Sequence, residues 1–310
     1  MASTTKIMTA LIALEKSDLD DLVKIDERSI NIEGSSIYLK NNEKISMKDL
    51  LYGLMLRSGN DAAVAIANYV NSEEEFVELM NEKAKALNAK NTNFTNPHGL
   101  SHDDHYSTAY DLALITREAF KYDIFEEISS AKTYTAKREE NEYFINKNKT
   151  LWEYDGGDGV KIGYTKAAGR CLVSSANRDG MRLIAVSLNA PDWFNDNYKL
   201  MDLAFEKYKP YTIYNKYQFI KKIHLENDDI DLNLIAENDF LYPLDDEEKD
   251  NIKVSITPYS NLELPIEKGQ VLGTIDTYLD GKLIKRDSLI SPDKLGKNSI
   301  IEKFLMLFYK

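Results

Sequence analysis

The pattern of hydrophobic and polar positions divides the chain into a helical part and a strand-rich part. From Ser3 to about Lys209, apolar residues recur mainly at helical spacing, and residues 7–14 are apolar enough to predict a buried first helix. Polar residues typical of N-caps predict the starts of three further helices, at Ser46, Ser72 and Thr108. The last helix of this part is expected from about Trp193 to Tyr208.

A short sheet is expected near the end of the helical part. Three stretches rich in β-formers follow one another at residues 160–165, 170–176 and 181–188. The turn residues Ala168-Gly169 and Asp179-Gly180 separate them, so the strands form consecutive hairpins and run antiparallel. Helices around an antiparallel sheet predict an α+β domain.

The pattern changes after about Tyr211. Short β-rich pieces alternate with Gly, Pro and Asp turns as far as Pro292, which predicts a small all-β domain. In Ser299–Lys310, five apolar residues share one helical face, but twelve residues are too few to span a bilayer. The predicted organisation is therefore 1–210, 211–292 and a C-terminal amphipathic tail, 293–310.

Composition and charge exclude several classes of function. The 310 residues are 43% hydrophobic and 29% charged, enough to bury one sizeable core and a second smaller one. A formal net charge of −12 offers no basic surface for a phosphate backbone, so nucleic acid is not an expected partner. Cys171 is the only cysteine, which excludes an intrachain disulfide and indicates strand packing. No run of about 18 apolar residues is present, so any membrane contact is expected to be peripheral.

The first candidate for chemistry is Ser3-Thr4-Thr5-Lys6, at the start of the first predicted helix. Three-residue spacing on a helix places the Lys6 amine about one turn from the Ser3 hydroxyl, where an unprotonated amine can accept the hydroxyl proton. The pattern alone is weak, because Ser291-Pro292-Asp293-Lys294 also matches it and is expected to be a turn. Locally, Ser3 as a helix N-cap and Lys6 as a surface lysine is the simpler interpretation.

Two further motifs follow along the chain. Ser58-Gly59-Asn60 lies in a predicted loop between two apolar helices, where both polar side chains can point into a cleft. Its alternative is a simple helix break with Asn60 as N-cap. Gly159-Val160-Lys161-Ile162-Gly163 places a lysine on a strand between glycines that allow close approach of a ligand backbone. Taken alone, Lys161 is interpreted as a charged residue at the edge of a strand.

In this order, the three motifs resemble those of the D-alanyl-D-alanine carboxypeptidases, low-molecular-mass penicillin-binding proteins of peptidase family S11. The resemblance extends to four longer stretches: Ala2–Ala10, Asn96–Leu100, His105–Leu112 and Gly163–Gly169. It covers about the first two hundred residues, and the strand-rich part resembles the family's accessory C-terminal domain. The implied fold is a serine β-lactamase/transpeptidase-like α+β domain followed by a small all-β domain.

The resemblance also implies a mechanism. Ser3 is the acylated nucleophile, Lys6 its proton acceptor, and Ser58 relays a proton to the leaving D-alanine. The remaining site residues bind substrate: Asn60, Lys161, Ile162, Gly163 and Tyr164, with the backbone N–H groups of Ser3 and Tyr164 as the oxyanion hole. The resemblance also implies that Asn60 holds Lys6 and that the positive charge of Lys161 keeps Lys6 unprotonated. The implied substrate is a peptidoglycan stem peptide, β-lactams are the implied inhibitors, and no metal or organic cofactor is implied. The implied location is extracytoplasmic, in the wall or on the outer face of the cytoplasmic membrane, with residues 299–310 as a peripheral membrane contact.

Two departures from the family pattern affect these expectations. The family has Lys-Thr-Gly where this chain has Lys161-Ile162-Gly163, so a hydroxyl expected to contact the substrate carboxylate is replaced. Family members also carry a signal peptide and two strands before the nucleophile, whereas Ser3 is the third residue here. We therefore expect these N-terminal strands to be missing, the gene to continue upstream, and the strand at 181–188 to be an open, association-prone edge.

Two other functions and one other type of site remain open from the sequence. A catalytically weakened penicillin-binding or scaffold homologue of the wall is favoured by Ile162, and a β-lactamase requires fast hydrolysis of the acyl-enzyme. His98, His102 and His105 suggest a metal site, but their spacing matches no strong ligand pattern, and a polar loop is the expected explanation.

Overall fold

The computed structural model describes residues 1–225 and 230–296, which form two compact units. The larger unit contains Met1–Arg178 and Arg182–Ala204. The smaller unit contains Asp179–Met181 and the described residues from Phe205 onward. The predicted fold class is confirmed: the first unit combines helices with an antiparallel sheet, and an all-β domain follows it.

The described helices are η1 (Ala2–Thr5), α1 (Lys6–Lys16), η2 (Glu27–Ser29), α2 (Met47–Leu56), α3 (Asn60–Val70), α4 (Glu73–Ala86), α5 (Ala109–Ala119), α6 (Asp123–Ser130), α7 (Thr150–Glu153), α8 (Trp193–Lys207) and η3 (Lys249–Asn251). The strands before α8 are β1 (Leu22–Lys24), β2 (Lys44–Ser46), β3 (Thr133–Thr135), β4 (Tyr143–Ile145), β5 (Gly157–Thr165), β6 (Gly169–Arg178) and β7 (Met181–Ser187). Those after it are β8 (Lys209–Tyr214), β9 (Phe219–Leu225), β10 (Ile230–Ala236), β11 (Phe240–Leu244), β12 (Ile252–Pro258), β13 (Val271–Leu279) and β14 (Lys282–Ile290).

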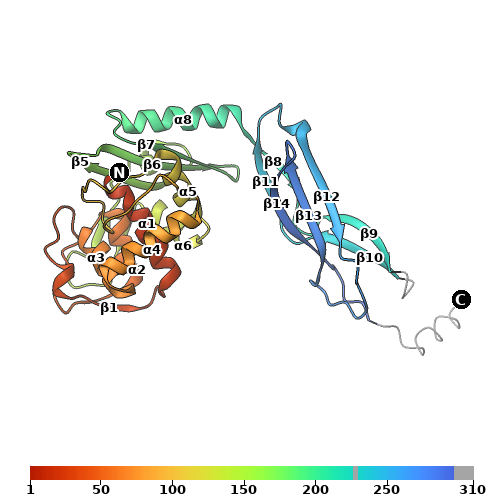
Figure 1. Cartoon of the computed structure of the whole chain (residues 1–310), viewed down its shortest axis with the longest axis horizontal. Helices are drawn as coiled ribbons and strands as arrows, with labels where there is room; N and C mark the ends of the chain where they lie inside the picture. The colour runs from red at the N-terminus through yellow and green to blue at the C-terminus, as the bar shows by residue number, and fades with distance from the viewer. Residues whose placement is uncertain (226–229, 297–310) are drawn as a thin grey trace, which may run out of the picture. The chain divides into compact units, whose positions relative to one another are not determined.

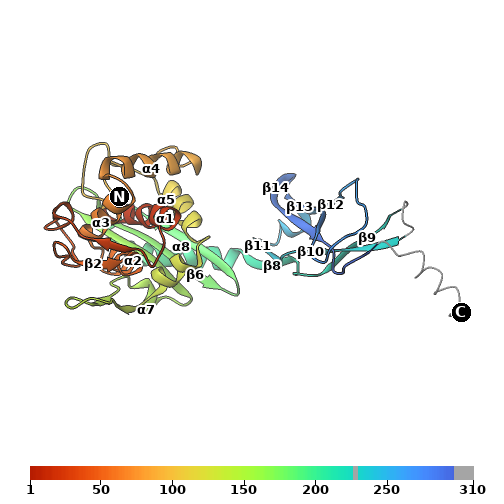
Figure 2. The same cartoon turned by 90° about the horizontal axis from the view of Figure 1, so that it is seen from below.

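The larger unit has three layers. The sheet β5-β6-β7 lies between α8 on one face and the layer of α1 to α6 on the other (Figure 1). Helix α1 lies inside the helical layer, where Ile7, Leu11 and Ile12 are at most 2% exposed. Figure 2 shows α4 and α7 on opposite sides of this unit. The catalytic candidates at the start of α1 are thus placed between the helical core and the sheet.

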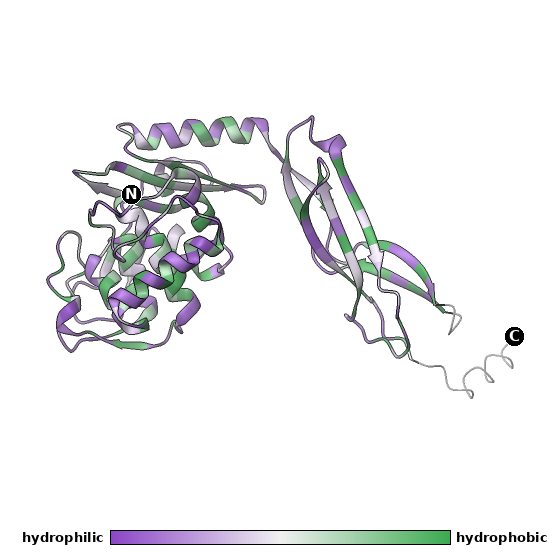
Figure 3. Cartoon of the chain, viewed as in Figure 1, coloured by the Kyte–Doolittle hydropathy of each residue, from purple (hydrophilic) through white to green (hydrophobic). Residues whose placement is uncertain are grey.

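Local capping explains why several helices begin where they do. The side chains of Ser46, Ser72 and Thr108 each accept a hydrogen bond from a backbone N–H three residues on, as predicted. Ser72 forms a complete capping box with Glu75. The helix α4 that follows mixes hydrophobic and hydrophilic residues along its length (Figure 3), which suits a helix with one buried side.

The first helix differs from the prediction. Ala2–Thr5 form a 3₁₀ turn, and the α-helix proper begins at Lys6. Ser3 therefore lies inside the turn, and no side-chain cap bond starts either helix, so the interpretation of Ser3 as an N-cap is wrong. Helix α6 and the short strands β1 to β4 were not predicted. The strands have three residues each, which is too few for a detectable alternation of apolar and polar positions.

The sheet has two edges, β5 and β7. Strand β6 pairs with β5 in antiparallel register, with Lys161 opposite Val173 and Gly163 opposite Cys171. A two-residue turn at Asp179 and Gly180, both with positive φ, connects β6 to β7, as is typical of a tight hairpin. Cys171 is 1% exposed within β6, as expected for strand packing. The prediction that the third strand is a sheet edge is confirmed.

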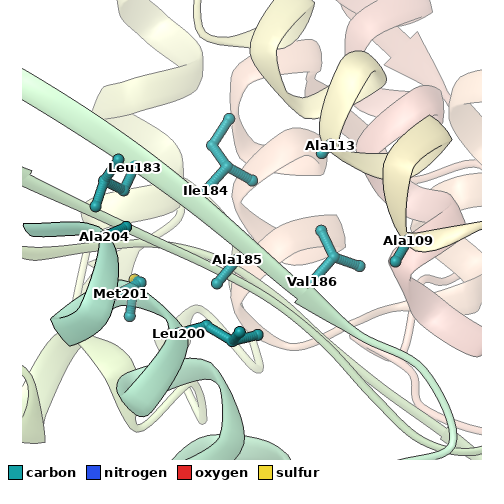
Figure 4. A pocket seen from close by; sticks show the side chains of 9 residues that line it. All are labelled: Ala109, Ala113, Leu183, Ile184, Ala185, Val186, Leu200, Met201 and Ala204. Atoms are coloured by element: carbon teal, nitrogen blue, oxygen red, sulfur yellow. The ribbon is translucent and has the colours of Figure 1, made fainter. Parts of the chain in front are cut away.

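An apolar groove follows the β7 edge. Side chains from β7, α5 and α8 line a cavity of about 280 Å³, which Figure 4 shows with Leu183 to Val186 along the strand. A second cavity of about 350 Å³ continues along the same strand and shares Ala113, Leu183 and Ile184 with the first. The outer side of β7 is thus bordered by hydrophobic surface on both faces of the sheet.

The smaller unit is built from two antiparallel sheets. One has five strands in the order β12-β13-β14-β10-β9, and the other pairs β11 with β8. Leu232, Leu272 and Leu289 are among the fully buried residues of its own core. Within the described residues, no helix is both long and apolar enough to cross a membrane. Residues 297–310 of the predicted tail, 293–310, lie outside the described residues, and these include its apolar face at 299–310.

Candidate active site

The start of α1 brings the first two candidate residues together. Lys6 follows Ser3 by one turn, and its Nζ lies 3.1 Å from Ser3 Oγ. Lys6 is fully buried, so the interpretation as a surface lysine is wrong. Thr5, also buried, donates from Oγ1 to the carbonyl of Ala2 at 2.9 Å, which fixes the 3₁₀ turn that carries Ser3.

The Lys6 amine has three polar neighbours, and two of them can only accept its N–H groups. Besides Ser3 Oγ, Nζ donates to Asn60 Oδ1 and to the carbonyl oxygen of His98, each at 2.6 Å. Both of these atoms only accept, so they use two N–H groups of the amine. A neutral amine has two N–H groups and one lone pair. In the neutral form the lone pair therefore faces the Ser3 hydroxyl.

Electrostatics favours that neutral form. Burial lowers the pKa of Lys6 well below its usual value, and the nearby charge of Lys161 lowers it further, against a smaller opposing effect of Asp61. Lys161 is itself 2% exposed, so the interpretation as a strand-edge charge is wrong. Burial, with a contribution from the charge of Lys147, lowers the pKa of Lys161 to about 7.

The second motif contributes through Asn60. Gly59 is the N-cap of α3 and Asn60 the first helical residue, so the alternative role of Asn60 as N-cap is wrong. Its Nδ2 donates to the carbonyl of Glu33, which orients Oδ1 toward Lys6. Ser58 precedes it in the left-handed region with φ of 61°, a strained conformation for a residue with a side chain. Among the described hydrogen bonds, none joins the Ser58 hydroxyl to Ser3 or Lys6.

The third motif places the edge strand β5 directly against the nucleophile. A Cβ atom added to Gly163 would lie 2.9 Å from the backbone nitrogen of Ser3 and 3.1 Å from that of Thr4, so only glycine fits without displacement. Lys161 shares this face of β5, because alternate residues of a strand point the same way. Ile162 and Tyr164 point to the other face, and Tyr164 is 63% exposed.

The candidate metal ligands have other partners. Nδ1 of His105 accepts from the backbone N–H of Thr95, and its Nε2 lies 2.8 Å from Thr5 Oγ1. Nδ1 of His98 accepts from the backbone N–H of Leu100. Burial lowers the pKa of His105 to about 3 and that of His98 to about 4. These neutral rings fix the loop over the nucleophile, and His102 is exposed beside Asp104.

Four supporting contacts were not predicted. The carbonyl of His98 binds Lys6, and Gly99 lies so close to the Ala2 carbonyl that a Cβ atom would come within 2.0 Å of its oxygen. The carboxylate oxygens of the buried Asp61 accept from the backbone N–H groups of Ile37 and Leu39, which fixes the loop beside Asn60. Ser101 Oγ donates to Thr165 Oγ1 at 3.0 Å and links the histidine loop to β5. A backbone carbonyl, or a carboxylate such as Asp61 that binds a loop, does not produce a recognisable motif in the sequence.

The other matches to the motifs do not form a site. Ser291 in Ser291-Pro292-Asp293-Lys294 donates to the carbonyl of Asp293, and this stretch is not helical. The expected turn is confirmed there. Of these two matches, Ser3-Thr4-Thr5-Lys6 is the one in which the lysine amine contacts the serine hydroxyl.

Comparison with known proteins agrees with this arrangement. Residues 1–192 match the model of the D-alanyl-D-alanine carboxypeptidase family. Residues 208–297 match the model of the penicillin-binding protein 5 C-terminal domain. The two matches follow the order of the two units along the chain.

Individual relatives cover nearly the whole chain. D-alanyl-D-alanine carboxypeptidase DacF of Bacillus subtilis is 36% identical over 97% of this chain and 80% of its own length. DacC of Escherichia coli is 36% identical over 93% and 76%. The crystal structure of penicillin-binding protein 5 from Haemophilus influenzae, at 31% identity, covers 95% of this chain and 90% of that one, with a TM-score of 0.68. The chain belongs to the D-alanyl-D-alanine carboxypeptidases, the hydrolases of serine peptidase family S11.

Proposed function

We propose that the chain removes the terminal D-alanine from peptidoglycan stem peptides through an acyl-enzyme on Ser3, and that β-lactams acylate the same hydroxyl. The observation that carries the proposal is the environment of Lys6 Nζ. Two of its three neighbours are pure acceptors, and the third is Ser3 Oγ at 3.1 Å. A buried neutral amine so oriented is a general base for the serine.

Each candidate residue has a role in this reaction. Lys6 takes the Ser3 proton as Oγ attacks the carbonyl carbon of the scissile amide. The backbone N–H groups of Ser3 and Tyr164 stabilise the resulting oxyanion, and one such donor is typically worth about 3 to 4 kcal/mol. Ser58 relays this proton from Lys6 to the leaving D-alanine nitrogen as the C–N bond breaks, so that Lys6 is neutral again and Ser58 keeps its hydroxyl. Water then attacks the ester, which regenerates Ser3 and releases the shortened peptide.

The remaining candidates hold the substrate. Asn60 contacts the substrate amide while its Oδ1 keeps Lys6 in place, and Gly163 leaves room for Tyr164 N–H to approach the reacting carbonyl. Lys161 contributes positive charge near the base. The donors used are side chains and backbone groups of the chain itself, so this mechanism uses no cofactor.

The substrate implies a location and a surface. Peptidoglycan stem peptides are outside the cytoplasmic membrane, so we propose an extracytoplasmic enzyme of the wall. The apolar face of Ser299–Lys310 would add a peripheral membrane contact. The net charge of −12 fits a peptide substrate rather than a nucleic acid.

The direct test is the intact mass of the protein after exposure to penicillin. Wild type should gain the mass of one penicillin, and Ser3→Ala should gain none while its circular dichroism is unchanged, because the hydroxyl forms the acyl bond. Ser291→Ala is a matched control, since Ser291 lies in the other Ser-X-X-Lys match, and should label fully. Labelling of Ser3→Ala would contradict the proposal.

Ile162 favours one other function, a weakened penicillin-binding homologue that holds wall peptides without turning them over. Such a protein would label with penicillin but release no D-alanine from a D-Ala-D-Ala peptide. Release of D-alanine over many turnovers supports the carboxypeptidase.

A further inference from the structure

The residue before the nucleophile has a strained backbone. Ala2 is 2% exposed and has a φ of 50°, in the left-handed region that a residue with a side chain seldom adopts. Such a conformation persists only where the surrounding structure holds it. The backbone angles of Ala2 also set the direction of the peptide group that joins it to Ser3.

That peptide group has two ends with different partners. The Ala2 carbonyl accepts a hydrogen bond from the Thr5 hydroxyl at 2.9 Å. The Ser3 N–H is at the other end, and in a planar trans peptide the carbonyl and the N–H point in opposite directions. Ser3 is the second residue of the 3₁₀ turn, so its N–H has no partner within the turn. A contact that holds the Ala2 carbonyl therefore also aims the Ser3 N–H.

A buried histidine determines how the Thr5 hydroxyl is oriented. The backbone N–H of Thr95 donates to His105 Nδ1 at 3.0 Å, so Nδ1 carries no proton. Burial lowers the pKa of His105 to about 3, so the ring is neutral near neutral pH and its one N–H is at Nε2. Nε2 lies 2.8 Å from Thr5 Oγ1 and therefore donates to it. The hydroxyl proton of Thr5 is left to bind the Ala2 carbonyl.

The loop between α4 and α5 that carries His105 is packed against this peptide. The ring of His105 is 8% exposed and lies edge to face with Phe94, with 5.9 Å between the ring centroids. Gly99 of the same loop approaches the Ala2 carbonyl, where an added Cβ atom would lie 2.0 Å from the oxygen. The histidine is thus held on one side by its own loop and reaches the nucleophile turn through Thr5.

We propose that His105 is a positioning residue that acts through Thr5 to aim the Ser3 N–H at the oxyanion. Its Nε2–H holds the Thr5 hydroxyl, and the hydroxyl holds the Ala2 carbonyl at the far end of the same peptide group. The inference rests on the proposed function and adds a support for its oxyanion hole. An oxyanion donor stabilises charge that develops in the transition state, so a loss of aim slows the chemical step and leaves substrate binding unchanged.

The kinetic test uses Thr5→Val, which removes the hydroxyl but keeps a β-branched side chain. We expect kcat on a D-Ala-D-Ala peptide and the first-order rate of penicillin acylation to fall about 30-fold, with KM changed less than about twofold. Thr5→Ser keeps the hydroxyl and should recover most of the rate. Thr9→Val is the matched control, because Thr9 is buried on the same helix and its hydroxyl donates to the Pro97 carbonyl of the same loop. It should act at the wild-type rate.

A double variant tests whether the histidine acts through Thr5. His105→Phe alone should slow acylation about as much as Thr5→Val does, and adding it to Thr5→Val should slow the reaction little further, because both changes break one relay. His105→Gln keeps an N–H donor near the Nε2 position and should recover part of the rate. Nitrogen-15 NMR of the wild-type ring should show a proton on Nε2 and none on Nδ1, a measurement that does not depend on the folding of any variant.

Three outcomes would each overturn the inference: an unchanged kcat in Thr5→Val, independent losses that multiply in the double variant, or a ring proton on Nδ1. A raised KM with kcat unchanged is the first of these outcomes, because it shows that the turn only shapes the binding site. In each case wild type still labels with penicillin, and the proposed function stands. If wild type neither labels nor releases D-alanine, the proposed function fails and takes the inference with it.

Discussion

The two edges of the β5-β6-β7 sheet belong to one small sheet but have opposite chemistry. The β5 edge presents Gly163 against the backbone of Ser3, with Lys161 buried behind it. The β7 edge presents Leu183, Ile184 and Val186 to cavities of about 280 and 350 Å³. The unpaired backbone of an edge strand can serve recognition in either case. Residue size and charge decide whether it approaches a reacting atom or only covers apolar surface.

The two edges also differ in what they contribute to stability. Lys161 in β5 and Lys6 of α1 are both buried with lowered pKa values, and burying these two amines costs free energy of folding. At β7, Ile184 and Val186 pack partly against the main hydrophobic core and stabilise the fold. The contrast teaches that the reactive edge is maintained at the expense of stability, and three changes test it.

The largest effect is expected from Gly163→Ala at the β5 edge. The new Cβ atom would lie 2.9 Å from Ser3 N and 3.1 Å from Thr4 N, and backbone cannot move aside as a flexible side chain can. The nucleophile and the oxyanion donors should shift by a fraction of an ångström. We expect the rate of penicillin acylation to fall about 100-fold.

Gly296→Ala is the control for this change, because no heavy atom of the described residues lies within 4 Å of its Cβ position. It should acylate at the wild-type rate. Thermal unfolding of both variants separates a displaced site from a damaged fold. A Gly163→Ala protein that acylates normally would show that the close approach of β5 is not needed for the chemistry.

An effect of intermediate size, on thermal stability, is expected from Lys161→Met. The pKa of Lys161 is about 7 in the folded chain against a usual 10.5, so between these pH values only the unfolded chain binds the proton. The free energy of unfolding of wild type therefore rises with pH through that window, and the burial cost is fully present below pH 7. Lys161→Met removes the cost, so its melting temperature should exceed that of wild type below pH 7, with a gap that narrows toward pH 10.5.

Lys149→Met is the control, because the ammonium of Lys149 is exposed and pairs with Glu153. Its removal should leave no pH-dependent difference in melting temperature from wild type. Thermal denaturation of the three proteins across the pH series provides the measurement. Equal melting curves for wild type and Lys161→Met at low pH would mean that the buried amine is solvated in the folded protein.

Local signals made much of this architecture predictable. The caps at Ser46, Ser72 and Thr108 depend only on a side chain and an N–H three residues away, so the sequence contains them entirely. The hairpin at Asp179 and Gly180 was readable for the same reason. Around the candidate site, spacing alone predicted that Lys6 lies one turn from Ser3.

The parts that failed depend on distant neighbours. Taken locally, Asn60 looked like an N-cap, and only the family resemblance implied that it holds Lys6, which its Oδ1 binds from 54 positions away along the chain. The burial of Lys6 and Lys161 depends on how β5 and the His98 loop close over α1, which no local pattern encodes. The carbonyl of His98 has no sequence signature at all, because every residue has a carbonyl. Side-chain roles and the two oxyanion donors were therefore predicted through motifs, and the backbone carbonyls that hold the side chains in place were not.

The smallest effect on activity, and a distinct one on association, is expected from Leu183→Lys at the β7 edge. Leu183 borders both cavities, and β7 is an edge of the sheet among the described strands. A charge on an edge strand discourages pairing with another chain. Light scattering should show less concentration-dependent association than in wild type, while the rate of penicillin acylation stays within about twofold, since β6 separates this edge from β5. Leu203→Lys on α8, at a residue already 64% exposed, should leave association unchanged. If both variants associate as wild type does, the apolar groove does not draw chains together. If acylation falls with Leu183→Lys alone, the two edges are coupled through β6, and the contrast between a reactive edge and an inert one no longer holds.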